Sequence, residues 1–202
     1  RDGGRFQIRW SADGVTSSTV MIQVIPKYDP TKNYRATLST EDGQIVIDLF
    51  QDRSPIAVKA FVDMAHSGVY DGLLIHEIHA DDILVGGSPA ASGIERRVVT
   101  FPAEQSSMPV VAGTVLMRPV GAAPPANSSP FMIVLRPRPE WTGQATVLGQ
   151  VVSGLDVAKK ISRRPSTQQT SRPYFKPLKD IEIRRVVIEE VPAAGAPASP
   201  AG

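Results

Sequence analysis

Residues 75–87 decide the fold, and they read Ile75-His76-Glu77-Ile78-His79-Ala80-Asp81-Asp82-Ile83-Leu84-Val85-Gly86-Gly87. The stretch is predicted as a strand region. Its two closing glycines fit a strand end better than a phosphate-binding loop, because the P-loop spacing is absent. His76 and His79 lie three residues apart on the predicted strand, so their side chains should point to opposite faces. His76 is interpreted as a buried core residue, and no metal site is expected.

Three carboxylates gather in the same stretch, at Glu77, Asp81 and Asp82. One interpretation is a solvated loop. The other is a docking surface for a basic segment of a partner protein, where opposite charges would give specificity. The sequence leaves both interpretations open.

The composition indicates one folded domain with a proper core. The chain has 202 residues, of which 42% are hydrophobic. The formal net charge is +2, and the basic residues form separated pairs, so nucleic-acid binding is not expected. Cysteine is absent, which excludes disulfides, thiolate metal ligands and a cysteine nucleophile.

Residues 1–33 are predicted to form an N-terminal β-hairpin extension and a connector. Phe6, Ile8 and Trp10 alternate with polar residues, turn-forming residues follow, and a second alternating run ends before Pro26. An isolated hairpin is marginal in water, so this one is expected to pack on the main domain or on another protein. Residues 192–202 are almost wholly Ala, Pro, Gly and Ser, and are expected to form a disordered tail.

The main domain is predicted to span residues 34–191 and to be mainly β. Two helices are expected, over 55–67, where Ser54 is a good N-cap, and over 155–162. Residues 118–130 contain four prolines and are predicted as a loop, and residues 163–180 are predicted as irregular. Strands are expected at 34–38, 44–50, 75–87, 98–101, 113–117, 131–135, 147–152 and 181–191.

Further motifs of the main domain lie at Gly43–Phe50, Ser54–Phe61, Gly68–Gly72, Gly113–Met117, Asn127–Ile133, Glu140–Trp141, Val147–Val151 and Gly154–Val157. Together with residues 75–87, their order and spacing resemble the cyclophilin family of peptidyl-prolyl cis-trans isomerases. The resemblance implies an eight-stranded, mainly antiparallel β-barrel capped by two helices, to which this chain adds the N-terminal hairpin.

The catalytic positions of this family are altered in the chain. Prolyl isomerisation has a barrier of ~18–20 kcal/mol because the amide C–N bond is partly double. The resemblance implies an arginine that donates to the prolyl nitrogen of the twisted amide, and a glutamine that grips the peptide backbone. Glu77 stands at the position of the arginine and Val85 at that of the glutamine. An ionised glutamate only accepts hydrogen bonds, so Glu77 cannot replace the arginine.

The predicted peptide groove keeps part of its apolar lining. Met132 stands where the family has its pocket phenylalanine, Asp82 replaces an apolar wall residue, and Pro130 replaces a second glutamine. Trp141 is retained, Thr142 replaces a leucine, and Ala145 falls near the position of the family's histidine. The residues predicted to bind peptide are Ile83, Ala122, Met132 and Trp141.

The sequence therefore favours a cyclophilin-like domain that has lost isomerase activity and serves as a protein-binding or structural subunit of a larger, membrane-associated assembly. The alternative is an active peptidyl-prolyl isomerase with altered specificity. The expected partner is a protein or a proline-containing polypeptide, without cofactor, metal or nucleic acid. The start without methionine, the Ala/Pro tail and the lack of cysteine favour an exported, periplasmic bacterial protein over a cytoplasmic one.

Overall fold

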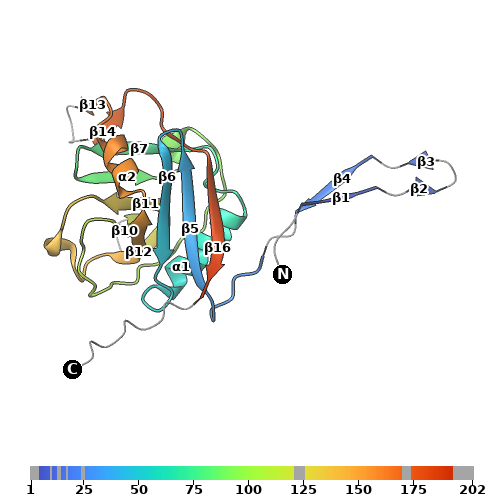
Figure 1. Ribbon diagram of the computed structural model, residues 1–202, viewed down its shortest axis with the longest axis horizontal. Coiled ribbons are helices and arrows are strands. Elements are labelled where there is room, and N and C mark those ends of the chain that lie inside the picture. Colours follow the sequence, from blue (N-terminus) through green and yellow to red (C-terminus); the bar gives the residue numbers. More distant parts are fainter. Residues whose placement is uncertain are drawn as a thin grey trace.

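The computed structural model describes residues 5–9, 11–12, 15–16, 18–23, 26–120, 126–169 and 174–192. It confirms the predicted mainly β fold, a nearly closed antiparallel barrel with two helices (Figure 1). The strands of the barrel sheet are β5 (Asn33–Thr40), β6 (Gly43–Leu49), β7 (Leu73–His79), β8 (Ile83–Gly86), β9 (Phe101–Pro102), β10 (Thr114–Val120), β11 (Ala126–Val134), β12 (Thr146–Ser153), β15 (Glu182–Ile183) and β16 (Arg185–Val191).

The barrel closes through its last two strands. The sheet order is β15-β7-β8-β11-β10-β12-β6-β5-β16, and β9 pairs with β11 outside this path. Only Arg184 separates β15 from β16, yet β15 pairs with β7 while β16 pairs with β5. Counted as one bent strand, β15 and β16 bring the path to the eight strands that the resemblance implies.

The barrel interior holds the main hydrophobic core, and the helices cover it. Helix α1 (Pro55–His66) buries one face made of Ala57, Val58, Phe61, Val62, Met64 and Ala65. Helix α2 (Leu155–Ser162) has the predicted bounds and buries Ala158 and Ile161. Figure 1 shows α1 at the lower end of the barrel and α2 beside the upper part of β6.

The N-terminus of α1 differs from its prediction. Ser54 occupies the N-cap position, but its side chain makes no capping hydrogen bond and its hydroxyl is buried without a partner among the described residues. The carboxylate of Glu104 accepts hydrogen bonds from the backbone N–H groups of Ile56 (3.2 Å) and Ala57 (2.8 Å) instead. A distant acidic side chain therefore satisfies the first turn, where negative charge is favourable.

Two predicted loops contain regular structure. Strands β10 and β11 reach into the region 118–130, so the predicted loop is wrong at 118–120 and 126–130, while 121–125 lie outside the described residues. The region 163–180 contains a second hairpin, formed by β13 (Ser166–Gln169) and β14 (Tyr174–Pro177). Two short 3-10 helices, η1 (Ala90–Ser92) and η2 (Pro139–Trp141), complete the main domain.

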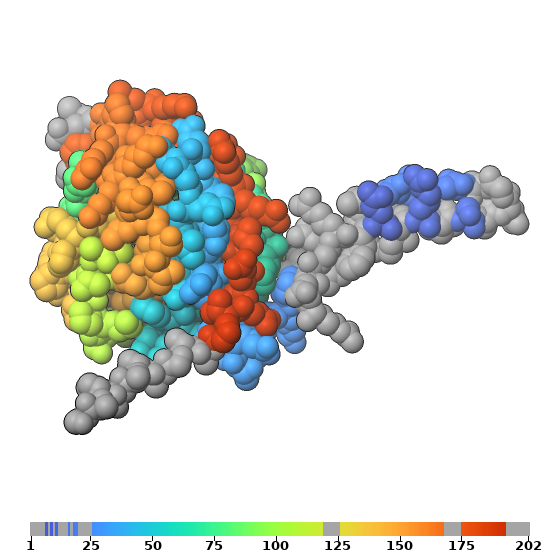
Figure 2. All heavy atoms as spheres, viewed as in Figure 1, coloured from blue at the N-terminus to red at the C-terminus, as the bar shows by residue number. Residues whose placement is uncertain are grey.

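The N-terminal hairpin is present and stands away from the barrel (Figures 1 and 2). Strand β1 (Arg5–Ile8) pairs with β4 (Val20–Gln23), and β2 (Ser11–Ala12) pairs with β3 (Val15–Thr16). Packing on the main domain, one of the two expected outcomes, is therefore not what the structure shows. Trp10 and the predicted tail from residue 193 onward lie outside the described residues. None of the described helices is long and apolar enough to cross a membrane.

Candidate functional site

Three of the altered positions, Glu77, Val85 and Met132, lie with Leu116 in one row across four neighbouring strands. Glu77 on β7 is paired with Val85 on β8, Val85 with Met132 on β11, and Met132 with Leu116 on β10. Residues directly opposite one another in a sheet point to the same side, so these four side chains share one face. Ile83 lies on this face too, because it is two residues from Val85 along β8.

This face is the outside of the barrel, since the alternate residues of the same strands fill the interior. Outside, a second apolar cluster is formed by buried Leu116, Val134, Val147 and Val110, against which Met132 and Trp141 pack half-buried, together with Phe50, Met108 and Ala145. The structure therefore brings together the predicted peptide-binding residues Met132 and Trp141 and places Ile83 on the same face. Ala122, the fourth predicted residue, lies outside the described residues.

Glu77 is buried and held by two partners. It is 7% exposed. Its Oε1 lies 3.0 Å from Nε2 of His79, and its Oε2 accepts a hydrogen bond of 2.6 Å from Nη1 of Arg118. Burial acts to raise the pKa of the Glu77 carboxyl, but the hydrogen bonds and charges of His79 and Arg118 outweigh it and lower that pKa below its usual value. The solvated-loop interpretation is therefore wrong for Glu77.

Arg118 reaches Glu77 across the face. It follows Leu116 by two residues on β10, where the register is irregular between Met117 and Pro119. Strands β8 and β11 separate β7 from β10, and three strand spacings amount to ~14 Å. Two extended side chains of these types together span such a distance. The ion pair of Glu77 and Arg118 therefore links β7 to β10 across β8 and β11, whose paired residues Val85 and Met132 form an apolar floor on the same face. Val85 is fully buried, Met132 is half-buried, and the Arg118 side chain remains 41% exposed.

The neighbouring carboxylates are also neutralised within the chain. Asp82 accepts hydrogen bonds from Arg136 and Arg138, and these contacts outweigh burial and lower its pKa. Asp81 pairs with Arg163 at 2.8 Å. The predicted acidic cluster is therefore matched by arginines of its own chain. Arg138 in addition lies over the Trp141 ring, 5.0 Å from its centroid.

The β13–β14 hairpin borders the site on the side of β7. The ring of Phe175 on β14 meets the His79 ring edge-on at a centroid distance of 4.8 Å. This ring contact fixes the position of His79, whose Nε2 is hydrogen-bonded to the Glu77 carboxylate. The hairpin was not predicted, because residues 163–180 are polar and interrupted by prolines.

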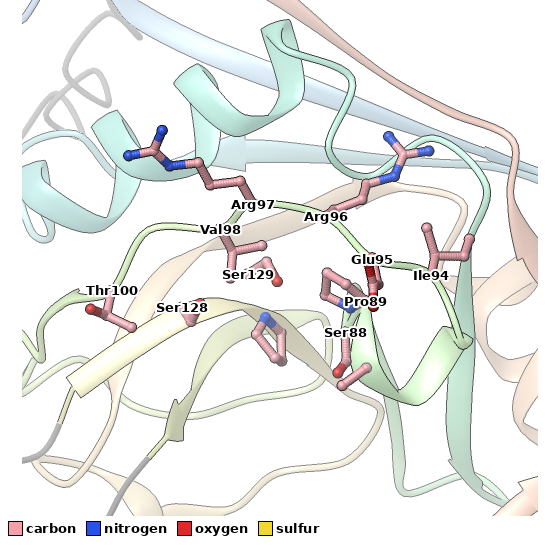
Figure 3. Close-up of a pocket in the computed structure, with 12 residues that line it drawn as sticks. Ser88, Pro89, Ile94, Glu95, Arg96, Arg97, Val98, Thr100, Ser128 and Ser129 are labelled. Carbon is pink, nitrogen blue, oxygen red and sulfur yellow. The ribbon is translucent and has the colours of Figure 1, made fainter.

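A cavity of about 630 Å³ is lined in part by Pro130 (Figure 3). Pro130 precedes Met132 by two residues on β11 and therefore shares its face. The cavity lies between the segment 88–100 and the start of β11, and Figure 3 shows Arg96 and Arg97 pointing away from it. The hydroxyl of Ser129 beside it is buried and has no hydrogen-bond partner among the described residues. The sequence predicted no such cavity, since the loop that covers it has no periodic pattern.

No cluster of three or more His, Asp or Glu side chains suited to a metal occurs in the described part of the chain. His76 is buried, as predicted, and burial lowers its pKa. The groups that the described residues bring to this face are apolar side chains, the Arg118 guanidinium and the Glu77 carboxylate.

Comparisons with known proteins agree with this geometry. The family described as "Cyclophilin type peptidyl-prolyl cis-trans isomerase/CLD" matches residues 35–188. A peptidyl-prolyl cis-trans isomerase of Schizosaccharomyces pombe is 34% identical over 148 residues, which cover 72% of this chain and 94% of the relative. Peptidyl-prolyl cis-trans isomerase B of Bacillus subtilis is 32% identical over 123 residues, which cover 60% of this chain and 86% of the relative.

A solved structure shows the same fold. The crystal structure of a cyclophilin type peptidyl-prolyl cis-trans isomerase of Cryptosporidium parvum is 25% identical and superposes with a TM-score of 0.69. The match covers 79% of this chain and 99% of that chain. The family match spans most of the barrel, including β7, β8, β10 and β11. The chain therefore belongs to the cyclophilin-type peptidyl-prolyl cis-trans isomerase family.

Proposed function

We propose that the chain binds proline-containing segments of polypeptides on the outer face of the barrel. The observation that carries the proposal is the half-buried pair of Met132 and Trp141, which lies over a buried apolar cluster and beside the cavity next to Pro130. Apolar pockets with few polar groups at their edge are the usual form of a small-ligand site. The relatives, named as peptidyl-prolyl cis-trans isomerases, support proline as the residue recognised.

The loss of catalysis predicted from residue 77 stays a prediction. It is supported by the carboxylate at this position and by Val85, whose side chain has no hydrogen-bonding group to grip a peptide backbone. Peptide binding does not depend on catalysis, because Met132 and Trp141, which pack on the outer apolar cluster, supply the apolar contacts.

Binding is tested by titrating a labelled protein with an Ala-Pro-containing peptide and following its NMR spectrum. We expect shifts of the Trp141 indole and the Met132 methyl signals, and loss of affinity of about tenfold or more in Trp141→Ala, since a buried aromatic anchor is worth over ~1 kcal/mol. Val187→Ala on β16, another partly exposed apolar side chain, is the matched control and should bind normally. Shifts spread evenly over the barrel, or none, would reject the groove as the binding site.

A second candidate function is that of a protein-binding subunit, as the sequence analysis favoured. It is supported by the N-terminal hairpin, which stands apart from the barrel in Figures 1 and 2 and so presents its edges to other molecules. Deleting residues 1–25 separates the two candidates. Peptide binding that survives the deletion assigns it to the groove, whereas a loss of self-association or of a bound partner, seen by sedimentation, assigns the subunit role to the hairpin.

A further inference from the structure

The groove contains a guanidinium although residue 77 is acidic. In the twisted prolyl amide, conjugation is lost and the nitrogen regains its lone pair. A cationic donor aimed at that nitrogen stabilises the twisted state more than the planar one, which is the condition for catalysis. Arg118 brings such a donor from β10 to Glu77 on β7, on the face that also holds Val85 and Met132.

We propose that Arg118 is the catalytic residue of this chain, donating a hydrogen bond to the prolyl nitrogen of a peptide bound in the groove. The inference rests on the proposed peptide binding and adds isomerase activity to it. It also replaces the predicted loss of activity by the opposite expectation. No covalent bond is formed or broken in this step, and the proton stays on the guanidinium throughout.

Glu77 and His79 are positioning residues in this arrangement. The guanidinium is planar and has five N–H donors in a fixed fork. Glu77 takes one of them through Nη1 at 2.6 Å, and among the described residues no other acceptor hydrogen-bonds Arg118. Glu77 is in turn fixed by His79, and His79 by the ring of Phe175. The other N–H groups of the Arg118 guanidinium are therefore held in one orientation and can still donate hydrogen bonds to a ligand.

The exposure of the pair leaves Arg118 accessible to a ligand. Glu77 is nearly buried, with its side chain 9% exposed, whereas the Arg118 side chain is 41% exposed. The buried partner is therefore the anchor, and the exposed partner keeps part of its side chain accessible to a ligand. An arginine at this exposure avoids the desolvation cost of full burial, and its charge remains available outside the pair.

The test is NMR exchange spectroscopy on an Ala-Pro-containing peptide, with peptide affinity measured on the same samples. We expect the wild-type protein to accelerate cis/trans exchange, and Arg118→Ala to lower the catalysed rate constant by about 100-fold, as removal of one such donor does elsewhere. Affinity should change only a few-fold, since the apolar floor is intact. Arg118→Lys, which keeps the charge and loses the fork, should recover part of the rate.

Two variants control for the loss of the ion pair itself. Arg35→Ala removes an arginine of similar exposure that pairs with Asp48 on the neighbouring strand β6, and its rate should equal that of the wild type. The double variant Glu77→Gln/Arg118→Gln leaves no unpaired charge in the groove, so it keeps the test valid if Arg118→Ala fails to fold. It too should lose the catalysed exchange.

The outcomes are distinguishable. Acceleration that survives in Arg118→Ala or in the double variant reduces Arg118 to a counter-ion and overturns the inference. Peptide binding without acceleration by the wild type overturns the inference and leaves the proposed binding function in place. If the wild-type protein does not bind the peptide at all, both the proposed binding function and the catalytic role of Arg118 are rejected.

Discussion

At the scale of single residues, Glu77 shows that a buried charged side chain requires partners of opposite charge. A carboxylate that is 7% exposed costs several kcal/mol unless it is paired, and here His79 and Arg118 supply the pairing. The glutamate at the position of the family's arginine thus occurs together with partners that suit it, His79 and Arg118. A groove with Glu77 and no Arg118 would leave an uncompensated carboxylate beside the apolar floor.

The lowered pKa of Glu77 makes part of the stability dependent on pH. Because the folded pKa lies below the ordinary value of 4.5, the contribution of Glu77 is complete above that value and is lost as the pH falls through the folded pKa. We therefore expect the free energy of unfolding to fall in acid less steeply in Glu77→Gln than in the wild type. The difference is at most about 1.4 kcal/mol per pH unit for one proton.

Urea denaturation at a series of pH values measures this slope. Glu189→Gln on β16 makes the same substitution at an exposed carboxyl and is measured beside Glu77→Gln for comparison. Equal slopes in Glu77→Gln and in the wild type would contradict the lowered pKa.

Whether a contact of the site could be predicted depends on how far apart its two residues lie in the sequence. Residues 75–87 were predicted as a strand region, and Glu77, Val85 and Ile83 do lie on β7 and β8, since the strand pattern is local. The contact of Arg118 spans 41 residues of sequence and depends on the irregular register beside Pro119, which no local pattern reveals. The acidic residue itself was the available signal, because a buried carboxylate requires a basic partner.

At the scale of the elements, helix α2 agrees with its predicted bounds while β10 and β11 are longer than expected. Prolines misled the prediction there. Proline lacks the N–H that a strand ladder uses, and it is tolerated at irregular positions. Pro119 follows the register shift in β10, and the pairing of β11 with β8 begins at Phe131, directly after Pro130.

Helix α1 offers a prediction of its own, since its N-terminus is capped from a distance. Glu104→Ala removes the acceptor of two backbone N–H groups and a favourable charge at the helix start, and should lower the free energy of unfolding by about 1–2 kcal/mol. Ser54→Ala, at the formal N-cap position, is the natural comparison and should cost less, because its hydroxyl makes no capping bond. Chemical denaturation measures both, and a larger loss in Ser54→Ala would contradict the assignment.

At the scale of the whole molecule, Tyr28 is the earliest described residue that packs against the main core. Tyr28 stacks on Tyr34 at 5.4 Å, and the main core is built from residues of the barrel and its helices. We therefore expect deletion of residues 1–25 to leave the free energy of unfolding unchanged within about 0.5 kcal/mol, the range of surface changes that touch no packed group. Thermal unfolding followed by circular dichroism tests this expectation. A matched deletion of residues 1–33, which removes Tyr28, should be destabilising.

The bent strand formed by β15 and β16 has a consequence for synthesis on the ribosome. Its two halves join β7 to β5, so the sheet has no closed form until the segment up to Val191 has emerged. Pairings between segments this distant in sequence form slowly, because the chain must first be brought together over a long loop. The nascent chain therefore carries open strand edges for most of its translation, and it should depend on protection from aggregation until its last strand is released.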